Sequence, residues 1–296
     1  MSMRITTGMV QRNVLADLNS ISGKLTRTQM KSASGKEIGR PSDDPFNASR
    51  ALALRTSMES TQQYQRNIQD AQGWQEAAEI ALADITDAIH RAVELTTGAA
   101  SDTTPPEARQ AVAAEIDQLI EGVKQNANAT YRGRYIFAGT ATDAPPYVAG
   151  DDAYHGSQQP VERQIGPGVD LPIGLIGESF LGDGADGKLL QVLRDVSTHL
   201  KNDDGVALRG DLELLNGKAD ELLGARALNG ARQNRLEAAL GRLGEVEEST
   251  LRQLSETEDA DIAKTLIELS SQQAAYQAAL KAGANIVQAS LMDFLR

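Results

Sequence analysis

One stretch of the sequence has the glycine spacing of a nucleotide-binding loop. Residues 182–187 read Gly-Asp-Gly-Ala-Asp-Gly, which matches the G-x-G-x-x-G pattern, and helical sequence follows. That pattern binds a dinucleotide because backbone N–H groups and a helix N-terminus face the pyrophosphate. Here Asp183 and Asp186 would repel the anion, and no second buried parallel strand follows within roughly 30 residues. We therefore predict a flexible link back into helical sequence.

The other residue types that could perform catalysis or bind a metal do not form a recognisable constellation. The histidines are far apart without H-x-x-x-H or H-E-x-x-H spacing, Gly-x-Ser-x-Gly is missing, and there is no cysteine. The aspartates stand in turns or lack the alternation and closing glutamate of a calcium loop. The sequence predicts no enzyme, catalytic residue, cofactor, metal site or small-molecule substrate. The residues considered are His90, His155, His199, Asp43, Asp44, Asp151, Asp152, Asp203 and Asp204.

Composition indicates narrow helical packing and excludes several partners. Aromatic residues make up 4% of the 296 residues, with Trp74 the single tryptophan, so little bulky material is present to fill a wide interior. The net charge is −12; residues 1–45 carry seven basic and four acidic residues, and residues 256–296 carry three and six. The basic excess is too diffuse for a nucleic-acid interface. No apolar run approaches the roughly 20 residues of a membrane helix, and no secretory signal is visible.

The positions of the prolines predict where long helices lie. All nine prolines fall between residues 41 and 172, and the stretches 46–104, 107–144 and 173–296 contain none. Asp44 before Pro45 predicts a capped helix start, after which apolar residues recur every three or four positions for about 50 residues. Thr104 and Glu107 predict a capping box for the next helix, with Pro105 at its first position.

Residues 138–187 have a different pattern and predict a small β-rich insert. Residues 161–165 and 169–173 flank Gly166-Pro167-Gly168, which indicates a hairpin. Helical spacing returns from Lys188 onward. We attribute the glycines in the following long helix to close approach of another helix, since each weakens the helix by up to about 1 kcal/mol relative to alanine. These glycines are Gly217, Gly224, Gly230, Gly241 and Gly244.

Both ends of the chain carry a heptad pattern. Steps of four and three predict one apolar stripe at each end, and we expect the two ends to pair with each other and with neighbouring copies. One more pair of helices in a monomeric bundle would give the same pattern. Because several stripe positions are polar or small, we predict that the terminal helices order fully only on assembly. The predicted partner-binding residues are Val14, Leu18, Ile21, Leu25, Ile262, Leu266, Leu269, Tyr276, Leu280, Val287 and Phe294; Thr28, Ser32, Gln273, Gly283 and Ser290 complete the stripes.

Several segments resemble bacterial flagellins, in the same order as in that family. They cover about residues 1–147 and 205–296, and the match at both ends is more specific than any one motif. The opening residues 3–7 and the run 133–140 resemble the proteins of the hook–filament junction, the third hook-associated proteins, more than filament flagellin. The other matching segments are Ser34-Gly35, Ser42-Asp43-Asp44, residues 230–236, residues 258–261, Leu269-Ser270 and Gln273.

The resemblance implies a structural role and a division of the chain. We expect a mainly α protein, an elongated bundle of long helices and coiled coil formed by both terminal regions. Residues 1–45 with 256–296 would form the terminal arms, 46–137 with 188–255 the long-helix bundle, and 138–187 the insert. The implied location is the extracellular flagellum, reached by type III export with a chaperone. The implied partners are the first hook-associated protein, flagellin and further copies in a junction ring. Filament flagellin and a soluble coiled-coil adaptor are the alternatives.

Overall fold

The computed structural model describes residues 7–101 and 103–294, with side-chain burial for Met9, 12–101 and 103–284. The chain divides into two compact units. The terminal unit comprises Met1–Ser60 and Val246–Arg296, and the central unit comprises Thr61–Glu245. Two long helices, α2 (Pro45–Ala99) and α6 (Gly205–Glu258), contribute a segment to each unit. The three-part division expected from the sequence stays a prediction.

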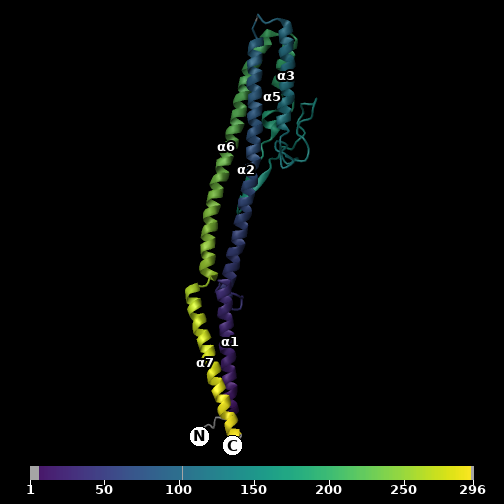
Figure 1. Ribbon diagram of the computed structural model, residues 1–296. Coiled ribbons are helices and arrows are strands. Elements are labelled where there is room, and N and C mark those ends of the chain that lie inside the picture. Colours follow the sequence, from purple (N-terminus) through teal and green to yellow (C-terminus); the bar gives the residue numbers. More distant parts are fainter. Residues whose placement is uncertain (1–6, 102, 295–296) are drawn as a thin grey trace. The chain divides into compact units, whose positions relative to one another are not determined.

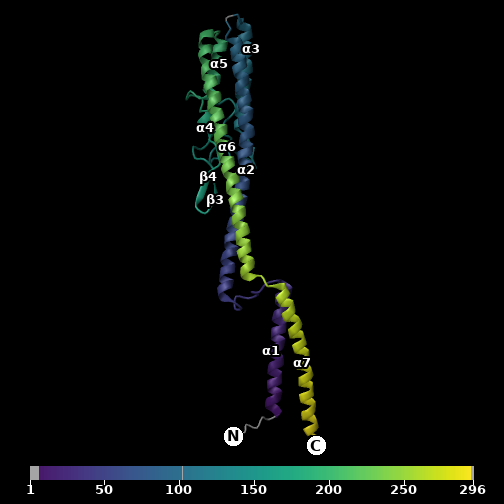
Figure 2. The same cartoon turned by 90° about the vertical axis from the view of Figure 1, so that its left-hand side faces the viewer.

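In the central unit, long helices lie side by side around one apolar core. The segments of α2 and α6 run alongside each other, and α3 (Pro106–Ala127) packs with α5 (Leu189–Lys201) (Figures 1 and 2). The core contains members of all four helices and of the insert. The largest fully buried side chains are Trp74, Tyr147, Phe137, Ile68, Leu82, Ile85, Ile89, Ile116, Ile120, Ile136, Leu171 and Ile173.

Two expected helix starts had different outcomes. Asp44 caps α2 as predicted, since its Oδ1 accepts the backbone N–H groups of Phe46 at 3.1 Å and Asn47 at 3.0 Å. The capping box at α3 was wrong. Pro106 holds Pro105 in an extended conformation, so the helix begins one residue later and has no side-chain cap. The Thr104 hydroxyl instead donates to the carbonyl of Gly98 in α2.

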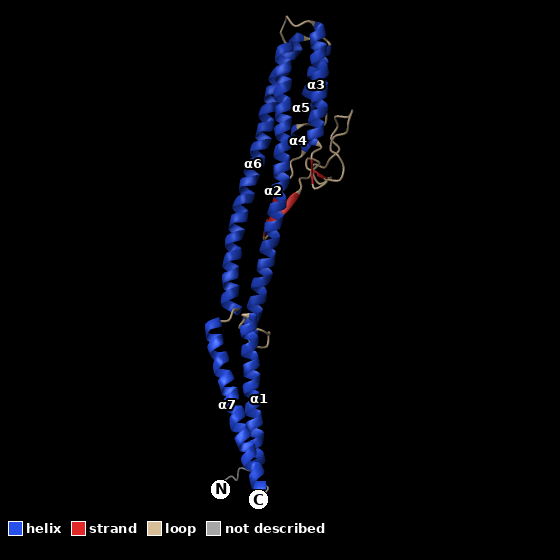
Figure 3. Cartoon of the chain, in the orientation of Figure 1, coloured by secondary structure: helices blue, strands red, loops and turns tan. Residues whose placement is uncertain are grey.

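The described residues form two small antiparallel pairs, drawn red in Figure 3, one just before the predicted insert and one within it. Strand β1 (Thr130–Tyr131) pairs with β2 (Arg134–Tyr135), and β3 (Glu162–Gly166) pairs with β4 (Val169–Pro172). The second pair is the predicted hairpin, with Gly168 at φ +66° in its turn and a register irregularity between Gln164 and Gly166. A short helix, α4 (Gly177–Phe180), follows before α5.

Side chains of the insert are anchored to the helices of the central unit. The buried amide of Gln75 in α2 donates to the carbonyl of Ile173 at 2.6 Å. Asp152 accepts from Lys124 of α3 at 3.1 Å and from Arg194 of α5 at 2.6 Å. Lys124 is itself almost fully buried, and Arg194 holds the pKa of the Asp152 carboxyl below its usual value. The insert is therefore fixed to the bundle by both core packing and buried charge pairs.

The glycines of α6 do not mark close helix approach, so that expectation was wrong. A Cβ added at Gly217, Gly224, Gly230, Gly241 or Gly244 would meet no atom within 4 Å in the part of the chain that the structure describes. Close approach occurs in α2 instead, where Tyr131 lies against Gly73 and leaves no room for a Cβ. The α6 glycines thus face open space in the single chain.

Candidate functional site

The terminal helices form an antiparallel pair within the terminal unit. Helix α1 (Thr7–Ser34) lies along α7 (Ile262–Phe294) in both views (Figures 1 and 2). The two helices come close at Gly283, where an added Cβ would lie 3.2 Å from Val14 Cγ1 and 3.8 Å from Leu18 Cδ1. At the other end of the pair, the backbone N–H of Ala260 donates to the carbonyl of Gly35 at 2.9 Å.

The face of α1 that packs in this pair is the predicted stripe. Val14, Leu18, Ile21 and Leu25 are all half-buried, while Thr28 is fully buried at 5% exposure. The other residues between them on the helix, such as Leu15 at 61%, are exposed except for the half-buried Ser22. On this helix the heptad spacing therefore identified the packing face.

The packing face of α7 differs from the predicted stripe. Its buried or half-buried residues follow the same four-three spacing, but at alternate steps they stand one position earlier in the sequence. Thr265, Gln272 and Ala279 occupy the positions expected for Leu266, Gln273 and Leu280. We call this set the inner stripe: Thr265, Leu269, Gln272, Tyr276, Ala279 and Gly283.

Large aliphatic side chains of α7 remain outside that packing. Ile262 and Leu280 are each 46% exposed and Leu266 is 51% exposed. We call these three residues the outer stripe. Leu269 and Tyr276, the other predicted members with described side chains, are half-buried in the inner stripe. Val287 and Phe294 lie beyond the residues whose side chains the structure describes.

Helix geometry explains the two stripes. Neighbouring residues on an α-helix are separated by about 100°, so Thr265 and Leu266 cannot face the same partner. Sequence reasoning selected the stripe with the larger apolar residues. The inner stripe has smaller or polar residues, and Ala279 and Gly283 allow the helices to approach closely. Small residues at heptad spacing were the signal that could have identified it.

The pair has little apolar core of its own. Among the residues of the terminal unit whose burial is described, only Ala51 and Leu254 are buried hydrophobic residues. The inner stripe also contains the buried Gln272 Oε1, which finds no hydrogen-bond partner among the described residues. Leaving such a group unpaired costs about 1–3 kcal/mol. The α1–α7 pair in one copy thus packs closely but leaves its apolar side chains only half-buried, and it includes polar residues in the packing face.

A charged brace connects the two joints of the terminal unit, residues 35–44 between α1 and α2 and residues 259–261 between α6 and α7. Lys36 Nζ contacts Glu258 and lies 2.7 Å from Asp259 Oδ1, and Glu258 also pairs with Arg55. Hydrogen bonds to Asp259 and Glu258 raise the pKa of Lys36, and the bond from Lys36 lowers the pKa of Asp259. Glu37 N–H donates to the Glu258 carbonyl at 2.7 Å. Both joints are held by the same cluster.

The glycine-rich loop at 182–187 is occupied by its own side chains. Asp186 Oδ1 accepts the N–H of Lys188 at 3.1 Å, and Gln191 Oε1 accepts the N–H of Gly187 at 2.6 Å. These are N–H groups at the start of α5 that a phosphate would need. Within residues 7–101 and 103–294, no cluster of three or more His, Asp or Glu side chains could hold a metal. Among the described helices, none is long and apolar enough to cross a membrane.

The chain is similar to known flagellar proteins. Residues 5–142 match the model of the bacterial flagellin N-terminal helical region. The chain is 29% identical over 176 residues to flagellar hook-associated protein 3 of Salmonella typhimurium, which covers 59% of this chain and 56% of that protein. It is 26% identical to flagellar hook-associated protein 3 of Escherichia coli over a 319-residue alignment, which covers 98% of this chain and 99% of that protein.

A solved structure shows the same fold. The FlgL protein of Bacillus cereus matches with a TM-score of 0.59 and 26% identity, over 69% of this chain and 99% of that one. The match to the Salmonella protein spans about half of its length, whereas the match to the Escherichia coli protein spans nearly all of it. Residues 5–142 therefore resemble the N-terminal helical region of bacterial flagellins, and nearly the whole chain is similar to a flagellar hook-associated protein 3.

Proposed function

We propose that this protein is a structural subunit of the bacterial flagellum that joins the hook to the filament. It polymerises through its terminal helices. The similarity to hook-associated protein 3 over nearly the whole chain supports the junction role. The observation that carries the polymerisation role is the outer stripe, three large aliphatic side chains exposed beside a helix pair that other residues close.

The energetics favour partners for this stripe. A fully buried large aliphatic side chain contributes roughly 1.5–3 kcal/mol relative to an exposed one. About half of each side chain is exposed. Covering all three with a neighbour would therefore stabilise the contact by a few kcal/mol of hydrophobic free energy. The terminal unit has few other apolar contacts of its own. Contact with neighbouring copies is therefore the step that completes its packing.

The proposed partners follow from the position at the junction. On the hook side the chain contacts the first hook-associated protein, and on the filament side it contacts the first layer of flagellin. Further copies of the chain lie beside it in a ring. The location is extracellular, after type III export with a dedicated chaperone. No enzymatic activity, nucleic-acid partner or membrane insertion is part of the proposal.

Filament flagellin is the second candidate, favoured by the matched N-terminal region, which flagellins define. The two candidates differ in self-assembly. A flagellin grows into long filaments when purified and concentrated, whereas a junction subunit stops at short oligomers. Electron microscopy of the purified chain separates them.

The function is tested in a strain that lacks its own junction protein, by scoring cells that retain filaments. The intact chain should restore retention. Leu266→Asp with Leu280→Asp should abolish it, because the charges stand on the outer stripe. The control is Ala275→Asp with Ala278→Asp, two exposed positions on the opposite face of α7, which should support retention. Normal retention with the outer-stripe variant would show that this face is not the assembly surface.

A further inference from the structure

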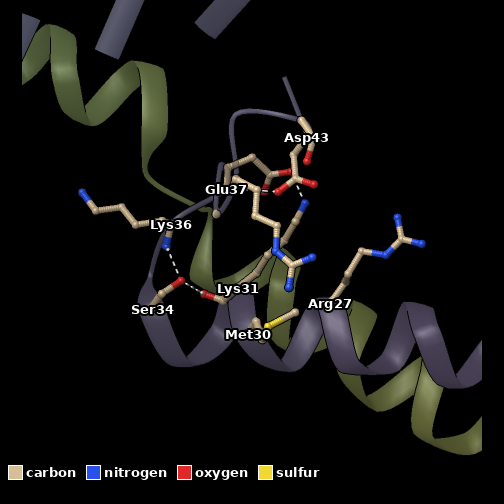
Figure 4. A pocket seen from close by; sticks show the side chains of 10 residues that line it. Arg27, Met30, Lys31, Ser34, Lys36, Glu37 and Asp43 are labelled. Atoms are coloured by element: carbon tan, nitrogen blue, oxygen red, sulfur yellow. Dashed lines mark hydrogen bonds and ion pairs between the residues drawn. The ribbon is translucent and has the colours of Figure 1, made fainter. Parts of the chain in front are cut away.

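A cavity of about 400 Å³ lies in the terminal unit, between the last turns of α1 and the segment that leads to α2 (Figure 4). From α1 it is lined by Arg27, Met30, Lys31 and Ser34. The connecting segment contributes Lys36, Glu37, Gly39, Arg40, Ser42 and Asp43. Four of these residues are basic and two are acidic, so the cavity has an excess of positive charge.

Most charges around the cavity have partners that hold its walls in place. Lys31 pairs with Glu37 across the opening, as Figure 4 shows. Asp43 accepts the backbone N–H of Arg40 at 3.0 Å, which closes a tight turn. Lys36 takes part in the brace with Glu258 and Asp259. The cavity is therefore preformed, and it does not depend on a ligand for its shape.

Two guanidinium groups of the lining have no ion-pair partner among the described residues. Arg27 and Arg40 are exposed, and neither side chain has a carboxylate or carbonyl partner among the described residues. Arg40 also lines an adjoining cavity of about 200 Å³, together with Ala51, Leu52 and the Arg55–Glu258 ion pair. Guanidinium groups bind carboxylates in a planar, two-pronged geometry. The unmatched charge at this cavity thus fits carboxylate side chains, and the exposed Met30 provides an apolar contact beside them.

Unpaired carboxylates occur elsewhere in the same unit. Glu256, at the end of α6, and Asp261, which caps α7, are both exposed and have no basic partner among the described residues. Their neighbours Glu258 and Asp259 are already engaged by Lys36 and Arg55. We call Glu256 and Asp261 the acidic turn. One copy of the chain therefore carries a preformed basic cavity at one joint and an acidic turn at the neighbouring joint of the brace, each with unpaired charges.

We propose that the basic cavity of one copy receives the acidic turn of a neighbouring copy. In a ring of identical subunits each contact joins two different patches of the same chain, so complementary unpaired patches on one copy are what such a contact requires. The charges fix the register between copies and favour correct encounters, while the outer stripe supplies apolar burial. This inference rests on the proposed function, because it presupposes contact between copies.

The test uses charge reversal in the full chain, in the strain that lacks its own junction protein. Arg27→Glu with Arg40→Glu should reduce filament retention by about tenfold or more. The matched control is Lys24→Glu with Arg50→Glu, which makes the same change in net charge at exposed positions outside the cavity. Circular dichroism of each purified variant confirms that helix content is retained.

A second variant reverses the other side of the contact. Glu256→Arg with Asp261→Asn removes the acidic turn while keeping a residue that caps α7. It should also reduce retention. Combining all four changes in one chain gives the cavity an excess of negative charge and the turn one positive charge, and retention should recover. Recovery in the combined variant is the decisive result, since a purely structural defect in either half would persist.

Two outcomes overturn the inference. One is normal retention with Arg27→Glu and Arg40→Glu, or a loss equal to that of the Lys24/Arg50 control. The other is a loss that the combined variant does not recover, which would assign the cavity to a different anion or protein. In either case the outer-stripe variant still decides the proposed function. If the outer-stripe variant fails to assemble, the proposed junction function is supported even though the contact between the basic cavity and the acidic turn is not made.

Discussion

The central and terminal units share α2 and α6 but bury apolar side chains very differently. In the central unit, a continuous core runs from Ile68 to Ala239 and includes an anchored insert. In the terminal unit, the buried hydrophobic residues among those described are Ala51 and Leu254, and large aliphatic side chains of α7 are exposed. The difference teaches that the central unit is packed around its own core, whereas the terminal unit leaves large apolar side chains of α7 exposed, and we propose that neighbouring copies cover them.

The largest expected effect is loss of a core side chain in the central unit. Trp74→Ala should lower the free energy of unfolding by about 3–5 kcal/mol, because the indole is fully buried and packs edge-on against Tyr131. The matched change in the terminal unit is Leu25→Ala, where a half-buried side chain should cost about 1 kcal/mol or less. Urea unfolding followed by circular dichroism measures both. Equal losses would contradict the contrast between the units.

The next effect concerns a buried cation at the turns of the central unit. Arg109 is 7% exposed, donates to the carbonyls of Ala99 and Ser101 at 3.0 Å, and pairs with Asp203. Arg109→Ala leaves those groups without this donor and should cost about 2–4 kcal/mol in the same urea experiment. Arg91→Ala removes an exposed arginine from two surface ion pairs and should cost less than about 1 kcal/mol. A similar cost for both would mean that burial at Arg109 contributes nothing.

A smaller effect of opposite sign is expected in α6. Gly217→Ala and Gly224→Ala should each raise the free energy of unfolding by about 0.5–1 kcal/mol, since alanine favours the helix and its methyl group would meet no atom within 4 Å. Gly168→Ala should have the opposite effect, because that glycine has φ +66° in the hairpin turn. Thermal unfolding of the monomer checks both signs. Destabilisation by the α6 changes would indicate a neighbour in the monomer.

The smallest effect is a pH dependence confined to the central unit. A hydrogen bond of 2.6 Å to Asp211 raises the pKa of His199, with Asp195 and Asp204 adding to it. A raised folded-state pKa stabilises the protein fully below the unfolded value of about 6.5, and this contribution is lost as pH rises through the folded value. Stability should therefore decline above about pH 6.5, and less so in His199→Gln. An identical pH profile for this variant would exclude the pair as the cause.

Much of the fold could be predicted from the sequence because its elements have local signals. Proline placement, the Asp44 cap and the Gly166-Pro167-Gly168 turn each act within a few residues of the structure they specify. The capping box failed because Pro106 holds Pro105 extended, which moves the start of α3 by one residue, and because the Thr104 hydroxyl donates to the carbonyl of Gly98 instead. Local signals place these elements to within a residue, and only the folded chain shows which partner each side chain finds.

The candidate site was predictable only in part. Heptad spacing identified the packing face of α1, but on α7 the predicted stripe and the inner stripe share Leu269, Tyr276 and Gly283. Choosing between the two stripes requires the distance between the helices. Small residues set that distance, and the hydrophobicity of the sequence does not reveal it. The brace around Glu258 joins residues more than 200 positions apart, as in its bond to Lys36, so no spacing rule could have found it. The glycines of α6 likewise gave no sign of which face they occupy.

Hydrogen exchange of the dilute monomer, compared with the assembled protein, tests the central claim most directly. The account predicts slow exchange in α3, α5 and the core segments of α2 and α6. Residues 262–284 of α7 should exchange much faster in the monomer and become protected on assembly, because their outer stripe is then covered. Protection of that segment in the monomer equal to that of the central unit would contradict the claim that the terminal unit is completed by its neighbours.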